Sequence, residues 1–234
     1  MKFPEFELDE TNHQLLIDLR KLYEIEFEVK DIEYCEVFTK NNKSIIFYNP
    51  RIVDNDSIAH ELLHIWLNTF NYISGNILFL LSQENIKLDK IFIKGLTDYI
   101  GNCMDHVKMY PKYIELGYDP NKFVTLGLKE KSFLNDLKKI NVKNIFNTYY
   151  SKSIELYIGN LISIYADHAQ NDYEKHLHLL EKKEPDLFII ITNFWNNWVK
   201  FDIKNIDTFY NCDIDLMSAF YDDIENWSKN KKIK

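Results

Sequence analysis

The sequence has little glycine, proline and cysteine, and it has no long hydrophobic run. Its 234 residues include six Gly and five Pro, which favours helices over a turn-rich β-sandwich. The apolar run Ile77–Leu81 is far shorter than the roughly 20 residues of a membrane-spanning helix. The acidic N-terminal stretch lacks the apolar segment of a signal peptide. We therefore expect a cytoplasmic protein that has no membrane partner.

Cysteine pairs and clustered positive charge are also missing. The three cysteines, Cys35, Cys103 and Cys212, stand far apart and form no CxxC pair, so neither a zinc ribbon nor a disulfide framework is indicated. The formal net charge of −8 argues against nucleic acid as a partner, because phosphate neutralisation needs clustered Lys and Arg. The short basic run Lys229–Lys234 is interpreted as a solvated tail.

The composition that is present is typical of a globular chain. Hydrophobic residues make up 46% and charged residues 27%, and the length is enough to bury a sizeable core. Residues 9–23 have a helical period, whereas 23–30 and 33–38 alternate between apolar and polar side chains, as strands do. A turn at 40–43 and a further strand at 44–48 predict a hairpin in a small antiparallel sheet.

Helical patterns dominate the rest of the chain. A helix capped by Asp54 or Asp56 is predicted up to about Phe70, and Pro111, with the glycine and proline that follow, indicates a boundary rich in turns. The remaining helical stretches are predicted at 77–81, 86–109, 122–139, 143–168, 171–183, 186–200 and 213–228. The sequence therefore predicts a mainly helical α+β fold, with the sheet confined to the first part.

The segment that indicates chemistry is His60-Glu61-Leu62-Leu63-His64, an HExxH motif. On a helix, positions i and i+4 share one face, so two imidazoles can bind one Zn²⁺ at about 2.0–2.1 Å. Glu61 is offset around the helix and can reach the water that the metal activates, as a general base. The predicted metal ligands are His60 and His64, and the predicted catalytic residue is Glu61.

The sequence leaves the third protein ligand open. Leu67 and Phe70 occupy the positions where a metzincin has Gly and His, which excludes that class. His106 is favoured, because it follows His64 by 42 residues and shares a predicted helix face with Asp98 and Asn102. The alternatives are Asp98, Glu84 and Asp105, and Asp98 or Asn102 could instead orient a ligand imidazole.

Other polar and aromatic residues carry weaker signals. One tyrosine near the third-ligand region could donate a hydrogen bond to an oxyanion, although core packing is the default interpretation. These tyrosines are Tyr99, Tyr110, Tyr113 and Tyr118. His168, His176 and His178 are interpreted as surface residues, because positions i and i+2 diverge on a helix. No glycine-rich phosphate loop and no GxSxG string occurs.

A hairpin followed by HExxH on a helix resembles the zincin-like metallopeptidases grouped as ImmA/IrrE-like. The string Asn102-x-x-x-His106, with Tyr110-Pro111 and Leu116-Gly117-Tyr118-Asp119 after it, is similar to a motif of uncharacterised bacterial or phage proteins near that group. The resemblance covers about residues 30–120. Leu63 replaces the glycine of the usual HELGH form. The resemblance implies a soluble zinc peptidase, in some cases one that cleaves a regulatory protein.

We expect residues 1–120 to form a zincin-like catalytic core and residues 121–234 to form a helical extension packed on it. The predicted function is hydrolysis of peptide bonds in a protein or peptide substrate, with Zn²⁺ as the cofactor. Two alternatives remain: a non-enzymatic helical interaction protein in which HExxH is fortuitous or structural, and a zinc hydrolase of a non-peptide amide. The sequence does not indicate the oligomeric state.

Overall fold

The computed structural model describes residues 7–70, 74–123, 130–168, 171–205 and 213–234. The chain forms two compact units: unit 1 comprises Met1–Asn71 and Lys108–Val124, and unit 2 comprises Tyr72–Val107 and Thr125–Lys234. Most described residues are helical and the main sheet is small, so the predicted mainly helical α+β class is confirmed. The predicted division at residue 120 stays a prediction.

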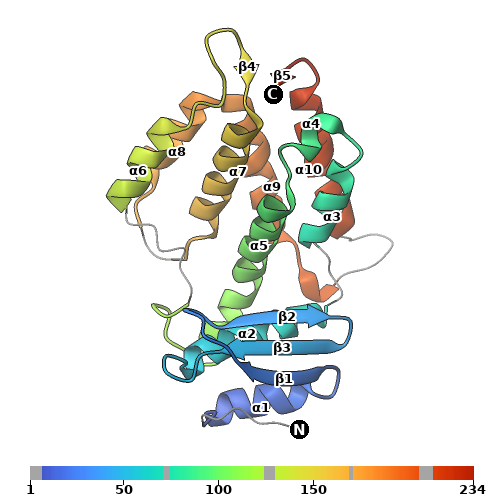
Figure 1. Ribbon diagram of the computed structural model, residues 1–234, viewed down its shortest axis with the longest axis vertical. Helices are drawn as coiled ribbons and strands as arrows, with labels where there is room; N and C mark the ends of the chain where they lie inside the picture. Colours follow the sequence, from blue (N-terminus) through green and yellow to red (C-terminus); the bar gives the residue numbers. More distant parts are fainter. Residues whose placement is uncertain (1–6, 71–73, 124–129, 169–170, 206–212) are drawn as a thin grey trace. The chain divides into compact units, whose positions relative to one another are not determined.

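Unit 1 contains the three-stranded sheet (Figure 1). Its elements are α1 (Glu10–Leu19), β1 (Glu24–Val29), β2 (Glu36–Lys40), β3 (Lys43–Tyr48) and α2 (Asn55–Asn68). The predicted hairpin is present, because β2 and β3 pair antiparallel, and Asn41 has the positive φ of 54° that its tight turn requires. However, β1 pairs parallel with β3. The sheet is therefore mixed, and the expectation of a wholly antiparallel sheet is wrong.

The core of unit 1 lies between one face of the sheet and its two helices. Strand alternation buries Ile25 and Phe27 of β1 on the same face as Ile46 of β3. Leu16 of α1 and Leu62 of α2 pack into the same cluster. This packing fixes the face of α2 that meets the sheet, and it leaves a second face of the helix for its histidines.

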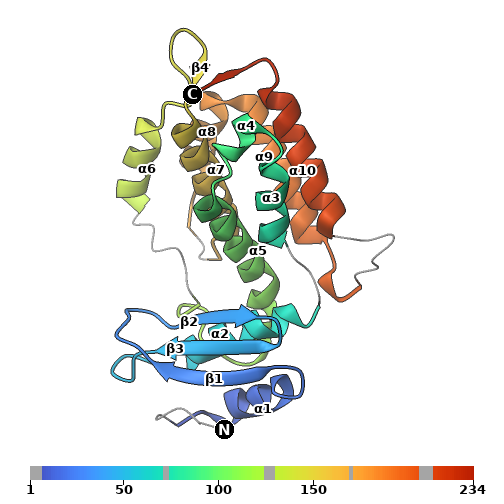
Figure 2. The ribbon, with the colours of Figure 1, turned by 45° about the vertical axis from the view of Figure 1, so that its right-hand side comes forward.

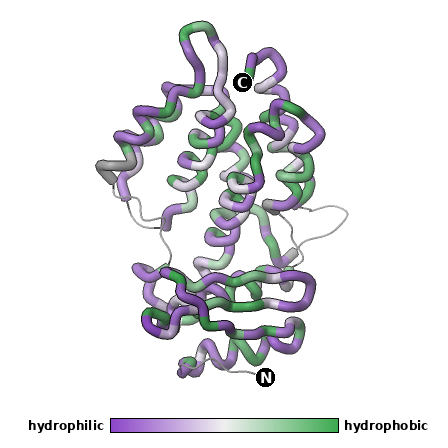
Figure 3. Tube along the Cα trace, viewed as in Figure 1, coloured by the Kyte–Doolittle hydropathy of each residue, from purple (hydrophilic) through white to green (hydrophobic). Residues whose placement is uncertain are grey.

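Unit 2 is built from helices (Figure 2). They are α3 (Ser74–Ser82), α4 (Ile86–Asp89), α6 (Glu130–Lys139), α7 (Ser151–Ala166), α8 (Glu174–Lys183), α9 (Pro185–Lys200) and α10 (Asp213–Ser228), with a short 3₁₀ turn, η1 (Ile203–Asn205). Hydrophobic and hydrophilic residues alternate along these helices (Figure 3), as amphipathic helices require. Buried aromatic residues such as Trp198 and Phe220 contribute to the core.

Helix α5 (Lys94–Glu115) passes from unit 2 into unit 1, since the division falls between Val107 and Lys108. The expected stop near Met109 is wrong, because the helix continues through Pro111 for another turn. Proline has no N–H to donate to the carbonyl four residues earlier, but its neighbours keep their helical bonds. The helix ends at Glu115, and the chain turns at Gly117, which has a positive φ of 90° and belongs to the turn-rich boundary that the sequence predicts.

Two short strands, β4 (Thr148–Tyr149) and β5 (Lys232–Ile233), pair in parallel within unit 2. The sequence predicted helix across Thr148, and this expectation is wrong. The C-terminal run that was expected to be a solvated tail is mostly exposed, but it also forms strand β5. Lys231 lies 4.7 Å from the ring of Trp227 and 4.0 Å from the carboxylate of Glu184. The end of the chain is therefore held by charge and by aromatic contact.

Within the described residues, no helix combines the length and hydrophobicity that crossing a bilayer requires.

Candidate metal centre

Helix α2 carries the HExxH motif and begins at a well-formed cap. Asp54 Oδ1 accepts hydrogen bonds from the backbone N–H of Ser57 at 2.9 Å and from its hydroxyl at 2.7 Å, which satisfies a donor at the first turn. Ile58, Leu62 and Ile65 are fully buried in the sheet core. The cap and this apolar stripe together set the start and the rotation of the helix, and so the direction of its polar face.

His60 and His64 lie one turn apart on that face. Their ring centroids are 5.1 Å apart, as the i, i+4 spacing predicts. The side chain of Phe123 packs on His60 with a centroid distance of 5.0 Å. His60 is only 4% exposed, and Phe123 is 1% exposed. The first histidine is therefore held by an aromatic side chain from a segment 63 positions later in the chain.

His106 of α5 completes a group of three imidazoles. One ligand nitrogen of His60, one of His64 and one of His106 all lie within 4.8 Å of one another. In a tetrahedral site with metal–nitrogen bonds of about 2.1 Å, ligand nitrogens are roughly 3.4 Å apart, so small side-chain rotations suffice. Neutral imidazole is a preferred donor for zinc, and the three residues therefore fit such an ion.

The other candidates for the third ligand have different environments. Asp98 forms an ion pair with Lys94 at 3.1 Å, and its side chain is 54% exposed. Glu84 is exposed and Asp105 is partly buried. Asn102, offered as an orienting residue, is also exposed. The structure therefore places His106, rather than a carboxylate, beside the two motif histidines.

Glu61 is 7% exposed and lies next to β2. Burial raises its pKa to about 7, while the charge of His64 and a hydrogen bond from the backbone N–H of Val37 act in the opposite direction. Val37 belongs to β2, one of the two outer strands of the sheet, so this strand holds the carboxylate from the side. A carboxyl group with a pKa near neutrality is suited to accept and return a proton.

A cavity of about 70 Å³ opens beside Glu61. Its walls are formed by Glu33, Tyr34, Cys35, Asn49, Ile52, Val53, Ser57, His60, Glu61 and Lys122. Burial, together with the carboxylates of Glu61 and Asp54, raises the pKa of Cys35 to about 12. The thiol of Cys35 is therefore protonated at neutral pH, and it does not act as a nucleophile or a metal ligand in that state.

A polar network fixes the segment that carries Phe123. The hydroxyl of Tyr113 donates to Asp56 Oδ1 at 3.0 Å, and the backbone N–H of Asp119 donates to the same atom at 3.0 Å. Lys122 Nζ lies 2.9 Å from Asp54 Oδ2 and 3.1 Å from Asp56 Oδ2. The first turn of the motif helix is thus connected to residues 119–122, and through them to Phe123.

Two of the candidate tyrosines are engaged in such structural bonds. Tyr113 is bound to Asp56, and the hydroxyl of Tyr118 donates to Asp9, the cap of α1, at 3.0 Å. Tyr110 packs edge-on against Phe123 at 5.0 Å. A role for Tyr110 at an oxyanion stays a prediction. The sequence did not indicate Phe123 or Lys122, because no local pattern distinguishes them. It offered Asp56 only as an alternative helix cap, whereas the cap is Asp54 and Asp56 instead accepts hydrogen bonds from Tyr113 and Asp119.

The histidines of the helical half are not all at the surface. His176 of α8 is 3% exposed and packs edge-on against Tyr173 at 5.3 Å, so the surface interpretation is wrong for it. His168 is half-buried, and burial lowers its pKa. His178 is exposed, as expected. The burial of His176 could have been predicted from its spacing, because Leu180 lies four positions later and so on the same face of the helix.

Comparisons with known proteins give no relative for this chain: no protein-family model, no curated protein and no solved structure matches it.

Proposed function

We propose that the chain is a zinc-dependent metallopeptidase of the zincin type, related to the ImmA/IrrE-like group that its motif resembles. The observation that supports this most is the convergence of His60, His64 and His106, three imidazoles from two helices, beside the buried carboxylate of Glu61. The three histidines would hold the ion through neutral ring nitrogens. Three protein ligands leave one position open for water and substrate, as catalytic zinc sites do.

When bound, zinc would supply a Lewis acid that polarises the scissile carbonyl and lowers the pKa of water. Glu61 accepts a proton from the attacking water at a carboxylate oxygen and then delivers it to the leaving amine. The backbone N–H of Val37 orients the carboxylate during both transfers. Phe123 packs on the imidazole of His60 and keeps water from that side of the site.

The substrate is proposed to be a protein or peptide in the cytoplasm. The two described cysteines, Cys35 and Cys103, are free thiols, as a reducing compartment would keep them. Helices of the HExxH type serve amide hydrolysis in general, so peptide cleavage must be tested directly.

The first experiment measures bound metal in protein purified without added zinc. We expect about one zinc per chain in the wild type, loss of most of it in His60→Ala, and retention in the control His178→Ala, which changes an exposed histidine of α8. A folded wild-type protein without bound metal would show that the motif is fortuitous.

The second experiment separates metal binding from chemistry. Glu61→Gln keeps the shape of the side chain but cannot accept a proton. It should retain zinc and lose at least about 100-fold of the hydrolysis of quenched fluorescent casein or a mixture of quenched octapeptides. Hydrolysis that survives in Glu61→Gln would show that Glu61 is not the base. Cleavage of small amides but of no peptide would favour the non-peptide hydrolase.

A further inference from the structure

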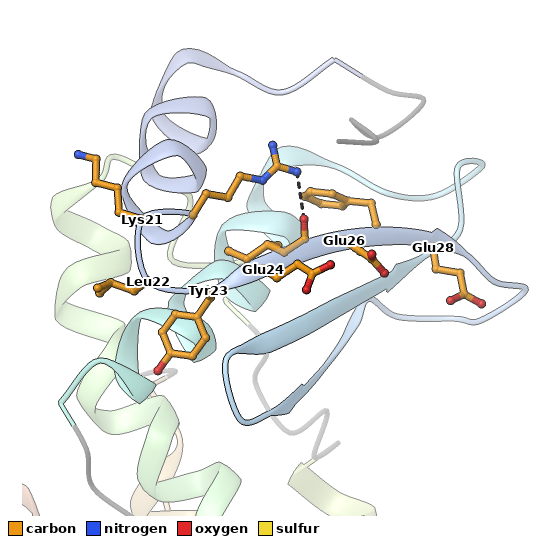
Figure 4. A pocket seen from close by; sticks show the side chains of 9 residues that line it. Lys21, Leu22, Tyr23, Glu24, Glu26 and Glu28 are labelled. Atoms are coloured by element: carbon orange, nitrogen blue, oxygen red, sulfur yellow. Dashed lines mark hydrogen bonds between the residues drawn. The ribbon is translucent and has the colours of Figure 1, made fainter.

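Unit 1 has a groove on the side of the sheet opposite β2. It has a volume of about 910 Å³ and is lined by residues 20–28, which are the first five residues of β1 and the segment that precedes the strand (Figure 4). The strand order β1-β3-β2 makes β1 an outer strand. Within the described residues, therefore, β1 pairs with a strand on one side only, and the groove follows its other side.

The backbone of β1 presents polar groups to this groove. Even-numbered residues bond towards the β3 side, since Glu24 N donates to Asn42 O at 2.7 Å and Lys30 N donates to Tyr48 O at 2.9 Å. The backbone N–H and C=O groups of the odd-numbered residues therefore point away from β3, towards the groove. In agreement, Ile25 O accepts a hydrogen bond from Arg20 at 3.1 Å on the open side. Arg20 thus covers the start of the edge, and the stretch from Phe27 to Val29 lies beyond it.

The side chains beside this edge are acidic. Glu24, Glu26 and Glu28 alternate with buried residues and so lie on one face, which Figure 4 shows. The side chains of Glu24 and Glu26 are 66% and 48% exposed. Lys43 pairs with both, at 3.6 Å and 3.0 Å. One lysine is shared by two of the three carboxylates. Lys21, which also lines the groove, pairs with Asp18 at 2.6 Å, and Arg20 is directed to the carbonyl of Ile25. The glutamate face therefore keeps a net negative charge. Leu22 and Val29, 59% and 50% exposed, add apolar surface near the two ends of strand β1.

We propose that the open edge of β1 binds an extended segment of a partner protein that carries Lys or Arg at alternate positions, by addition of a strand to the sheet. Main-chain hydrogen bonds to Phe27 and Val29 would supply affinity, as in other cases of strand addition. Basic residues of the added strand that lie directly opposite Glu26 and Glu28 would have their Cβ atoms about 4.5–5.5 Å from the Cβ atoms of these glutamates. Charge therefore selects the occupant, and the open backbone selects its extended conformation.

A second copy of this chain is a poorer occupant. Antiparallel pairing of β1 with itself would set glutamates opposite glutamates, and like charges directly opposite one another are destabilising. Acidic side chains on an outer strand protect it against such self-association. The edge is also separate from the outer strand β2, which contacts Glu61, so the proposal does not depend on the proposed peptidase.

The test uses fluorescein-labelled acetyl-(Thr-Lys)₄-amide and measures its anisotropy with the full chain. We expect saturable binding at low salt that weakens at 0.5 M salt. Glu26→Gln/Glu28→Gln should bind about fivefold more weakly, since two cross-strand charge pairs are lost. The control Glu10→Gln/Glu115→Gln removes the same charge from exposed helix positions of unit 1 and should bind as the wild type does. Equal weakening in the control would overturn the proposal.

The backbone contribution is tested with Val29→Pro, which removes an amide N–H on the open side, and Val29→Ala, which keeps it. We expect Val29→Pro to lose about fivefold more affinity than Val29→Ala. A probe methylated at alternate backbone nitrogens should lose affinity similarly on the wild-type protein, so the test holds even if Val29→Pro fails to fold. Absence of saturable binding, equal binding of (Thr-Glu)₄, or a dimer in sedimentation that Val29→Pro dissociates would each refute the proposal.

Discussion

Replacement of Glu184 should strongly destabilise unit 2, because this carboxylate is buried and joins four partners. Its side chain is 3% exposed. It accepts hydrogen bonds from Lys143 at 3.0 Å, from Trp227 Nε1 at 3.1 Å and from the hydroxyl of Tyr149 at 3.3 Å, and Lys231 lies 4.0 Å away. These residues belong to the loop before β4, to α10, to β4 and to the C-terminal segment. One carboxylate therefore connects segments that are distant in sequence.

The magnitude follows from what each substitution leaves behind. Glu184→Ala leaves the N–H of Trp227 and the hydroxyl of Tyr149 buried, at about 1–3 kcal/mol for each group that stays unsatisfied. Loss of the ion pair with Lys143 costs less free energy, because the side chain of Lys143 is 37% exposed and water can hydrate it. We expect a total loss of about 3–5 kcal/mol, typical of a broken buried ion pair. Glu184→Gln keeps an acceptor for Trp227 and should lose about 2 kcal/mol, the value of one charge-assisted hydrogen bond.

The assay is urea unfolding followed by tryptophan fluorescence, which reports mainly on unit 2 because three of the four tryptophans, Trp195, Trp198 and Trp227, lie there. The control is Asp136→Ala, which breaks an ion pair between Asp136 and Lys139 with side chains 65% and 76% exposed; it should change the free energy of unfolding by less than about 0.5 kcal/mol. A loss below about 1 kcal/mol for Glu184→Ala would refute the reasoning.

Three further outcomes are expected. Phe123→Leu removes the ring that packs on His60 and should weaken zinc binding about tenfold in competition with a fluorescent chelator, whereas unchanged affinity would show that the ring does not position the ligand. The pKa of Cys35, about 12, leaves a very small thiolate fraction at pH 8, so in a Cys103→Ala/Cys212→Ser background iodoacetamide should alkylate it roughly a thousandfold more slowly than glutathione. The rate should rise with pH without levelling off by pH 9, and a plateau near pH 8.5 would contradict this. Tyr118→Phe loses the hydrogen bond to Asp9 and should lower the free energy of unfolding by about 1.5–3 kcal/mol, measured by urea titration of circular dichroism against Tyr34→Phe, whose side chain is 73% exposed.

Much of the local structure could be predicted from sequence periods. Helices α2, α9 and α10 begin and end close to the predicted positions, since caps and apolar spacing act within a few residues. The hairpin of β2 and β3 followed from a turn signal between two alternating stretches. The stop at Pro111 was wrong because a proline costs a helix one hydrogen bond, and packing can compensate for that loss.

Part of the candidate site could likewise be predicted from local spacing, and part of it could not. The HExxH spacing brings His60 and His64 to one helix face by geometry alone, and Glu61 follows from the same helix. The position of His106, 42 residues later, depends on how α5 lies against α2, and periodicity does not encode that. The role of Phe123 beside His60, and the role of Asp56 as an acceptor for Tyr113 rather than as a helix cap, could not be recognised because both come from contacts with distant segments.

By itself, the sequence determined the mainly helical class, the hairpin and the two motif histidines, because each depends on interactions between residues a few positions apart. Only the tertiary structure decided the parallel pairing of β1, the place of His106, the burial that raises the pKa of Glu61, and the network around Glu184. The physical reason is that burial and long-range contact are properties of packed surfaces, and their free energies arise only after segments far apart in the chain have come together.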